Sequence, residues 1–199
     1  MIERLETPRL ILRKARESDL EAVWRNVWRD AAIARWMLWA PTRTLEDARA
    51  RMARTLAYQA RADAFFVCLK ADDAPIGFAG VVEREPGVFE ETGICVARAH
   101  QDRGYGREVL GALLRLAFDL NAGERFVYSC FNDNLPSAAL CRALGFRYDR
   151  TEPRVREWDG YAYDLDLYCL SRDAYCSARS GPGGARSCGD GCDARSHYP

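Results

Sequence analysis

The sequence predicts a domain of the α+β class in which strands and helices form layers. Three observations support this class. Three successive extended runs, separated by turn residues, occupy the middle of the chain at 64–70, 76–83 and 91–97. The last of these runs leads through a glycine turn into an amphipathic helix. Extended and helical patterns then alternate as far as residue 170. The resulting element order is β-α-α-β-β-β-α-β-α-β-β.

The first part of the chain combines a strand with helical segments. The run Arg9–Arg13, with Leu10, Ile11 and Leu12 at its centre, predicts a strand. Ser18 with Glu21 forms a capping box ahead of a helix. A segment rich in Trp and Met at 30–39 predicts a short helical piece. Thr44 opens a further helix, whose apolar residues share one face: Leu45, Ala48, Met52 and Leu56.

The second half of the chain alternates helices and strands. After the glycine turn, apolar residues recur at helical spacing as far as Gly123: Val109, Leu110, Leu113, Leu114, Ala117 and Leu120. A strand is predicted at 125–131, and a helix follows that opens at Asn134 and ends at Gly145. Two final strands are predicted at about 146–152 and 161–170.

A change of composition sets the predicted domain boundary. From residue 177 the chain consists largely of Ser, Gly, Arg and Pro, with little to bury. We therefore predict one domain over 1–176 and a disordered tail over 177–199.

Bulk composition excludes several classes of function. The chain has 199 residues, of which 48% are hydrophobic, as expected for one soluble domain. Lys plus Arg and Asp plus Glu both number 29, so no basic field indicates nucleic acid or an anionic membrane surface. No apolar run reaches the length of a membrane span, and the N-terminus lacks a signal-peptide core. A cytoplasmic location is therefore expected.

The cysteines predict buried thiols and not a metal site. Four of the eight lie inside extended apolar runs: Cys68, Cys95, Cys130 and Cys169. Cys188, Cys192 and His197 in the tail do not have the spacing of a standard zinc site. No metal is therefore expected.

The turn Gln101–Gly106 is the strongest candidate for a ligand site. Gly104 and Gly106 allow a sharp bend and leave no Cβ between the backbone and a ligand. The first N–H groups of the following helix lack internal partners and suit a phosphate. The turn is not a dinucleotide fingerprint, because Val109 stands where that motif needs a small residue, and no Walker Gly-Lys-Ser/Thr is present. A simple connecting turn is the alternative interpretation.

The turn resembles the acetyl-coenzyme A loop of the GNAT acetyltransferase superfamily, whose signature is Gln/Arg-x-x-Gly-x-Gly/Ala. Gln101, Gly104 and Gly106 occupy its three fixed places. Over about 9–175, the element order also resembles this family. Further short stretches resemble its branch of ribosomal-protein N-terminal (alanine/serine) acetyltransferases: Leu5–Arg13 with Asp19, Ile76-Gly77-Phe78, Glu91-x-Gly93, Asn134-x-x-Ser137 with Leu144-Gly145-Phe146, and Asp159-Gly160 with Tyr163 and Asp164.

The resemblance implies both a fold and a reaction. The implied fold has a mixed, mostly antiparallel central sheet of about seven strands with helices on both faces. The implied reaction is transfer of an acetyl group from acetyl-CoA, as cosubstrate and without a metal, to an amine acceptor in a ternary complex. The acceptor is either a protein N-terminus or a small primary amine, and acyl length and a homodimer are left open. The alternatives are a catalytically silent acyl-CoA-binding module and an interaction domain that keeps only the fold.

The resemblance also implies which residues bind the cofactor. The backbone of Ile94, Cys95 and Val96 would lie along the pantetheine arm, with the N–H of Cys95 or Val96 facing the thioester carbonyl. Strand alternation places Glu91, Gly93 and Cys95 on one face, unless a bulge resets the register. Asn134 belongs to the second cofactor motif. Backbone N–H groups of the loop would hold the pyrophosphate: Gln101, Asp102, Arg103, Gly104, Tyr105, Gly106 and Arg107.

Acetyl transfer to an amine needs a proton acceptor and a proton donor. An alkylammonium has a pKa of about 10.4 and must lose a proton before attack, and the leaving thiolate must gain one. Glu91, or Glu83 across the sheet, is the candidate base, acting through water; a solvated or ion-paired edge carboxylate is the alternative for each. Cys141 stands where many family members carry a proton-donating tyrosine. Ser137 and Cys141 are therefore the candidate acids, with simple packing as the alternative for Cys141 and a backbone-bonding hydroxyl for Ser137.

The acceptor side is less defined. Trp36 and Trp39 lie in the segment that walls the amine pocket in this fold, and Glu83 is grouped with them as a candidate substrate contact. A core role is the alternative for the tryptophans. His100, beside the loop, is predicted to be a surface turn residue.

Overall fold

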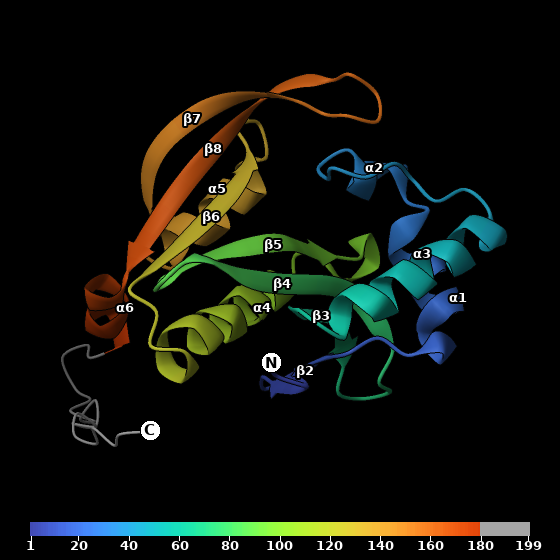
Figure 1. The fold of residues 1–199 in the computed structure, drawn as a ribbon, viewed down its shortest axis with the longest axis horizontal. Coiled ribbons are helices and arrows are strands. Elements are labelled where there is room, and N and C mark those ends of the chain that lie inside the picture. The colour runs from blue at the N-terminus through green and yellow to red at the C-terminus, as the bar shows by residue number, and fades with distance from the viewer. Residues whose placement is uncertain (180–199) are drawn as a thin grey trace, which may run out of the picture.

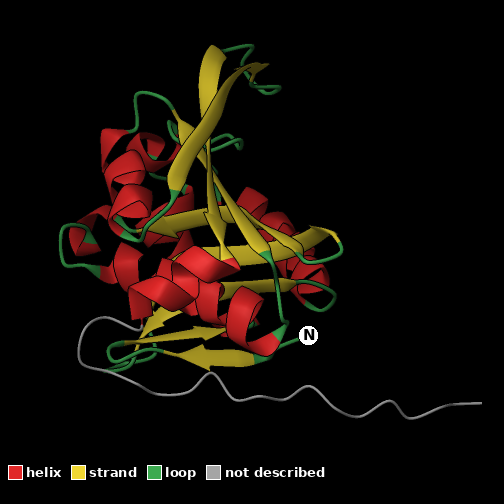
Figure 2. Cartoon of the chain, turned by 90° about the vertical axis from the view of Figure 1, so that its left-hand side faces the viewer, coloured by secondary structure: helices red, strands yellow, loops and turns green. Residues whose placement is uncertain are grey.

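A computed structural model describes residues 1–179, which form one eight-stranded sheet in the order β1-β2-β3-β4-β5-β6-β8-β7. All neighbouring strands are antiparallel except β5 and β6, which are parallel. Helices cover both faces of the sheet (Figure 1, Figure 2). The predicted α+β layered fold is confirmed. The strand count exceeds the predicted seven because a short β1 pairs with β2.

The elements follow the predicted order, with short additions at the two ends. They are β1 (Arg4–Glu6), β2 (Leu10–Arg13), α1 (Leu20–Val23), α2 (Ala31–Ala34), α3 (Leu45–Gln59), β3 (Asp63–Leu69), β4 (Pro75–Glu85), β5 (Val88–Val96), α4 (Tyr105–Leu114), β6 (Arg125–Phe131), α5 (Leu135–Ala143), β7 (Arg147–Val155), β8 (Ala162–Ser171) and α6 (Arg172–Arg179).

One predicted helix start is right and another is wrong. Thr44 begins α3, and its hydroxyl accepts a hydrogen bond from the Asp47 backbone N–H at 3.1 Å. Ser18 does not cap α1. Instead the Asp19 carboxylate accepts from the Arg16 N–H at 2.7 Å and pairs with the buried Arg13 guanidinium at 2.8 Å. A buried charge needs a close counter-charge, so the ion pair decides how the chain enters this helix.

Helix α4 supplies much of the core beneath the sheet. Its predicted apolar face is buried, including Val109, Leu110 and Leu113, and it packs against β2, β4 and β5. The helix continues as a π-helical segment, Arg115–Leu120. Only the last predicted position, Leu120, is exposed, because it lies at the end of this segment. Helices α1 and α3 cover β4 and β3 on the other face (Figure 1).

Helix α6 extends past the predicted domain boundary at 177. Its Tyr175 ring stacks on Phe118 at 4.7 Å between centroids, and its hydroxyl donates to Asp119 at 3.1 Å. Arg172 also donates to the Gly123 and Phe118 carbonyls, and Arg179 pairs with Asp119. The sequence did not predict this helix because polar side chains provide much of its attachment. Residues 180–199, which include the tail residues Cys188, Cys192 and His197, lie outside the described residues.

The sheet divides between β5 and β6. The two strands pair only at Val88↔Arg125, Phe89↔Phe126 and Glu90↔Val127. Beyond this point β6 pairs with β8 alone, as far as Phe131. The carboxyl halves of β5 and β6 therefore separate, and each leaves one backbone edge without a strand partner.

A bulge in β5 resets the register that simple alternation predicts. Ala79 pairs with Ile94, and Val81 pairs with Glu91, so Gly80 faces two residues of β5. Paired residues of antiparallel strands share a face, so Glu91 shares its face with Ile94 and not with Cys95. Cys95 pairs with Phe78 and lies on the opposite face.

The predicted buried thiols are found where the strands place them. Cys68, Cys95 and Cys130 are buried, and Cys169 is half-buried. In residues 1–179, no helix is long and apolar enough to cross a membrane.

Candidate active site

A cleft opens where β5 and β6 separate, and most of the predicted cofactor residues line it. It has a volume of about 570 Å³. Its walls come from the end of β5, the turn before α4, β6, the start of α5 and the segment after α2. The predicted residues that line it are Ile94, Cys95, Val96, Gln101, Asp102, Gly104, Tyr105, Gly106, Arg107, Asn134, Ser137 and Trp36. Arg103 is exposed beside the cleft.

The glycine turn leaves the start of α4 open. Asp102 and Gly104 both have left-handed φ values, 59° and 78°, and Gly104 is the N-cap residue of α4. Because glycine has no side chain, no cap bonds the first N–H groups of this helix. By contrast, Thr44 caps α3 and Asn134 caps α5. The open N–H groups of Tyr105, Gly106 and Arg107 suit an anionic ligand.

Arg9 holds this turn from outside. Its Nη2 donates to the Arg103 carbonyl at 2.8 Å, its Nε bonds the Glu108 carboxylate, and its guanidinium lies 4.5 Å from the centre of the Tyr105 ring. Thr7 also donates to Glu108, at 2.6 Å. The Thr7-Pro8-Arg9 stretch therefore supports the turn through one carboxylate, which explains its place in the sequence resemblance.

Gln101 fixes the orientation of the β5 edge. Its Nε2 donates to the Val96 carbonyl at 2.9 Å. The Ala97 N–H donates to the Ile76 carbonyl of β4 at 2.6 Å, so the backbone groups of Ala97 face β4. Successive residues of a strand direct their backbone groups to opposite edges. The N–H and C=O of one strand residue point to the same edge. The N–H groups of Ile94 and Val96 therefore face the cleft, whereas that of Cys95 faces β4.

Ser137 lies at the cleft next to a tyrosine that sequence reasoning missed. The Tyr128 hydroxyl is 2.7 Å from Ser137 Oγ, and both residues line the cleft. Burial, with the nearby Glu91 carboxylate adding to it, raises the pKa of Tyr128 above its ordinary value. The phenol is therefore protonated at neutral pH. Nothing in the order of residues pairs a mid-strand tyrosine with a helix serine, although both belong to the same β6–α5 unit.

Cys141 is not brought to the cleft. It is fully buried, and its thiol donates to the Ala138 carbonyl at 3.2 Å within α5. Burial raises the pKa of the Cys141 thiol to about 12. The geometry is that of a packing residue, which was the alternative for this position.

Glu91 lies behind the cleft wall and does not line the cleft itself. It is buried at the bulge, where its carboxylate accepts from the Gly93 N–H and from the Ser129 hydroxyl at 2.9 Å. Burial raises the pKa of Glu91. Both oxygens thus have partners, one on β5 and one on β6. This carboxylate bridges the two strands just beyond the point where they separate.

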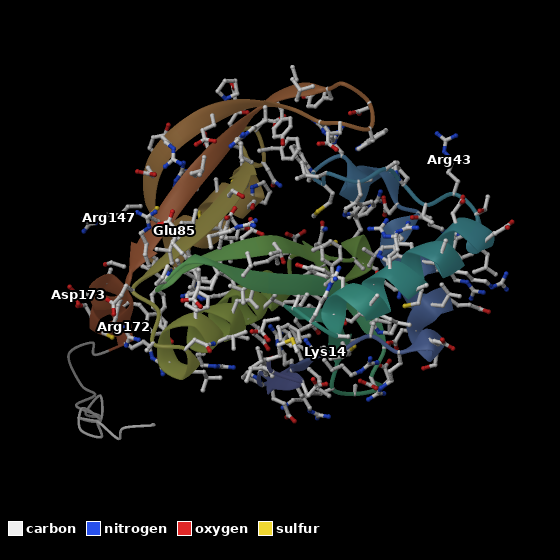
Figure 3. All side chains as sticks on the ribbon, viewed as in Figure 1. Lys14, Arg43, Glu85, Arg147, Arg172 and Asp173 are labelled. Carbon is white, nitrogen blue, oxygen red and sulfur yellow. The ribbon has the colours of Figure 1, made fainter. Side chains whose placement is uncertain are left out.

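Glu83 is not part of this site. It lies near the β4–β5 turn, where its carboxylate accepts from the Gly87 N–H at 2.8 Å. Figure 3 shows Glu85, two positions further along, at the end of the sheet beside β8 and α6 and far from α3. The strand register places Glu83 opposite Phe89, in the part of the sheet where β5 and β6 are still paired and no cleft opens. No local sequence pattern reveals this register.

The two tryptophans and His100 separate into different environments. Trp36 lines the cleft and packs edge-on against Phe131 at 6.1 Å. Trp39 lines a second cavity of about 600 Å³ between α3 and the sheet. His100 also lines the cleft, half-buried rather than at the surface as predicted, and its Nδ1 is buried without a hydrogen-bond partner among the described residues.

The described residues offer no metal site. Within 1–179, no group of three or more His, Cys, Asp or Glu side chains is placed to hold an ion. The polar groups of the cleft include the open backbone N–H groups at the start of α4 and the hydroxyls of Tyr128 and Ser137, which suit a phosphate and an acyl group.

The chain resembles known acetyltransferases in sequence and in structure. The family model for the acetyltransferase (GNAT) domain matches residues 9–147. An uncharacterized N-acetyltransferase, YnaD of Bacillus subtilis, is 26% identical over 168 residues, which cover 81% of this chain and 95% of that protein. A GNAT acetyltransferase structure from Bacillus anthracis matches with a TM-score of 0.74 at 20% identity, over 85% of this chain and 99% of that one.

A ribosomal-protein acetyltransferase is among the structural neighbours. RimL, solved in complex with coenzyme A, matches with a TM-score of 0.71 at 22% identity, over 86% of this chain and 99% of that one. At this identity the match shows the shared fold. The family model spans well over half of the sequence. The uncapped N-terminus of α4 also lies beside the point where β5 and β6 separate. The chain therefore belongs to the GNAT acetyltransferase family and is an N-acetyltransferase.

Proposed function

We propose that this chain binds acetyl-CoA in the β5–β6 cleft and transfers the acetyl group directly to a primary amine in a ternary complex. The proposal rests on one observation: an uncapped helix N-terminus and a pair of hydroxyl groups line the same cleft. The uncapped N–H groups at the start of α4 and the Tyr128–Ser137 pair line the same cleft. The first feature suits a pyrophosphate, and the second suits a departing thiolate.

The predicted cofactor residues divide into three groups under this proposal. The N–H groups from Asp102 to Arg107 bind the pyrophosphate, whereas the N–H of Gln101 donates to the Arg98 carbonyl at 3.2 Å. Asn134 shapes the cleft by capping α5. The exposed edge of Ile94 to Val96 runs beside the pantetheine arm. The Val96 N–H, which faces the cleft, is the better donor to the thioester oxygen than that of Cys95. A fixed N–H at that place stabilises the negative charge that develops during attack.

The hydroxyl pair supplies the proton. The amine nitrogen attacks the thioester carbon, the C–S bond breaks, and the sulfur takes a proton from Ser137, which Tyr128 replaces. The nitrogen loses its own proton to water in the cleft, and this water returns a proton to Tyr128, so that both hydroxyls are protonated again at the end of the cycle. Glu91 contributes by positioning, because its carboxylate fixes the bulge that turns Ile94 and Val96 toward the cleft. Trp36 walls the entry to the cleft. Cys141 and Glu83 have no role in this scheme.

Calorimetric titration of acetyl-CoA tests the proposal. We expect micromolar binding by the wild type and its loss in Gly104→Glu and Gly106→Glu, since a carboxylate would occupy the anion site. Gly111→Glu is the matched control on α4, where an added Cβ meets nothing within 4 Å. Release of CoA thiol with a panel of amines then separates an enzyme from a silent acyl-CoA-binding module. Equal binding by the wild type and both loop variants would contradict the cofactor site.

A further inference from the structure

The cavity between α3 and the sheet has an unusual charge pattern. It is about 600 Å³, a size suited to a small molecule, and it adjoins the cleft because Gly93 lines the cavity and the next residue, Ile94, lines the cleft. Six aromatic residues are among those that line it: Trp28, Trp39, Tyr58, Phe65, Phe66 and Phe78. Its charged lining consists of two arginines, Arg51 and Arg54, and includes no carboxylate.

Within residues 1–179, Arg51 has no counter-charge. No described carboxylate lies within ion-pairing distance of it, although sixteen other pairs of the described chain meet that criterion. Burial lowers the pKa of Arg51 to about 10, with repulsion from Arg54 adding to the effect. A half-buried guanidinium without an anion is unfavourable, and a ligand anion would relieve it.

The guanidinium is held in place by neutral groups. It lies 4.1 Å from the centre of the Trp39 ring and 4.7 Å from that of Trp28. Its Nη1 donates to the Thr42 hydroxyl at 3.0 Å. Thr42 is itself fixed, since its N–H donates to Trp28 and its carbonyl accepts from Trp24 Nε1. The arginine is therefore oriented before any ligand arrives.

Part of the guanidinium is open to the cavity. Apart from the bond to Thr42, Arg51 makes no hydrogen bond with its side-chain nitrogens to any described residue. None of these nitrogens is shut off from solvent without a partner. Its free N–H groups therefore reach the cavity, in the planar arrangement that binds a carboxylate or a phosphate at two points.

We propose that this cavity, hereafter the Arg51 cavity, is the acceptor site and that it selects a small primary amine carrying an anionic group on an apolar or aromatic body. The anionic group pairs with Arg51, and the body packs against Trp39 and Phe78, which line the same cavity. The amine then points past Gly93 toward Ile94 and the thioester. This inference rests on the proposed function, and it names the substrate class of the same enzyme. Cationic polyamines are disfavoured, because the cavity offers them no carboxylate.

Matched acceptor pairs test the inference. Aminomethylbenzoate is compared with its amide, phenylalanine with its amide, and phosphoethanolamine with ethanolamine; the last pair tells phosphate from carboxylate. Each is assayed by CoA thiol release and, separately, by calorimetric binding with and without CoA. The variants are Arg51→Gln and Arg51→Lys. Arg49→Gln is the control, because Arg49 is exposed on the same helix and forms no hydrogen bond or ion pair with a described residue.

We expect at least one anionic member to bind and react at least 30-fold better than its neutral partner, since removing one member of a desolvated charge pair usually costs about that factor or more. Arg51→Gln should abolish the preference, Arg51→Lys should restore part of it, and Arg49→Gln should leave it unchanged. Thermal unfolding of each variant shows whether it is folded.

Three outcomes would overturn the inference. If acetyl-CoA is bound and turned over but no pair shows a preference, or if Arg51→Gln keeps the preference and loses only thermal stability, Arg51 is a structural clamp between two tryptophans. If acetyl-CoA does not bind, the proposed function fails instead. In that case the calorimetric arm still decides whether the Arg51 cavity takes the anionic probes, and absence of binding there would reject the inference as well.

Discussion

The Tyr128 hydroxyl lies 2.7 Å from Ser137 Oγ, so a mid-strand residue of β6 and the first turn of α5 form one hydroxyl pair. The pair lines the cleft, whereas Cys141 is buried one turn further along α5. Proton donation to the leaving thiolate therefore belongs to this pair under the proposed function, and the following substitutions test this and related points.

Removing either hydroxyl should slow acetyl transfer. We expect Ser137→Ala and Tyr128→Phe each to lower kcat by roughly 10- to 100-fold, with little change in the Kd for acetyl-CoA. The double variant should lose little more than either single one, because the two groups act as a unit. Steady-state kinetics and calorimetry measure the two quantities. An additive loss in the double variant would show two independent roles.

Cys141→Ala tests the role suggested by the sequence. We expect kcat to stay within about twofold of the wild type, because the thiol bonds the Ala138 carbonyl inside α5 and does not face the cleft. The free energy of unfolding should fall by about 1 kcal/mol, as for other small buried groups. A large fall in kcat with normal stability would restore Cys141 as the proton donor.

The buried Glu91 carboxylate should make stability depend on pH. Its pKa is raised in the folded state, so protonation favours folding, and this contribution is lost as pH rises through the raised pKa. Glu91→Gln lacks that dependence. The free energy of unfolding of the wild type, relative to Glu91→Gln, should therefore decrease as the pH rises above the ordinary glutamate pKa of about 4.3. Urea unfolding at several pH values measures it, and a constant difference would show that Glu91 titrates normally.

Arg9→Ala should weaken cofactor binding without unfolding the domain. The change removes the bonds to Glu108 and to the Arg103 carbonyl, so the turn before α4 loses its external support. We expect the Kd for acetyl-CoA to rise about tenfold, which corresponds to about 1.4 kcal/mol. Arg4→Ala is the control, since that exposed arginine pairs with Glu6 on β1. Equal effects of the two changes would argue against a role for Arg9 in shaping the turn.

Arg156→Ala should loosen the segment that walls the cleft. Arg156 is buried in the β7–β8 loop, where it pairs with Asp159 at 2.7 Å and donates to the Arg35 carbonyl at 2.8 Å and to that of Met37 at 3.3 Å. Figure 1 shows this loop reaching toward α2. We expect a loss of about 2–4 kcal/mol in the free energy of unfolding, because several polar groups lose their partner.

The same change should raise the KM of the amine, since Trp36 and Met37 line the cleft. Arg154→Ala, at an exposed position two residues earlier, provides the comparison. If both variants have the same stability and KM, the loop does not support the cleft wall.

The sequence by itself determined most of the fold. Helical and extended spacing located the elements from β2 to β8, because burial of one face imposes a period that can be read locally. The glycine turn was equally readable, because Gly104 adopts a left-handed φ of 78° that other residues rarely accept. The ends were missed, since β1 and α6 are short and are held by a few tertiary contacts.

Only the tertiary structure decided which side chains share the cleft. Because of the bulge opposite Gly80, Cys95 and Glu91 lie on opposite faces of the sheet. No sequence pattern marks the position of this bulge. Strand register and helix packing bring Tyr128 into contact with Ser137 and Arg51 into contact with Trp39. Both depend on the whole sheet. Local sequence sets each backbone segment, but contacts between distant segments set the chemistry, because the register that joins them is a property of the assembled core.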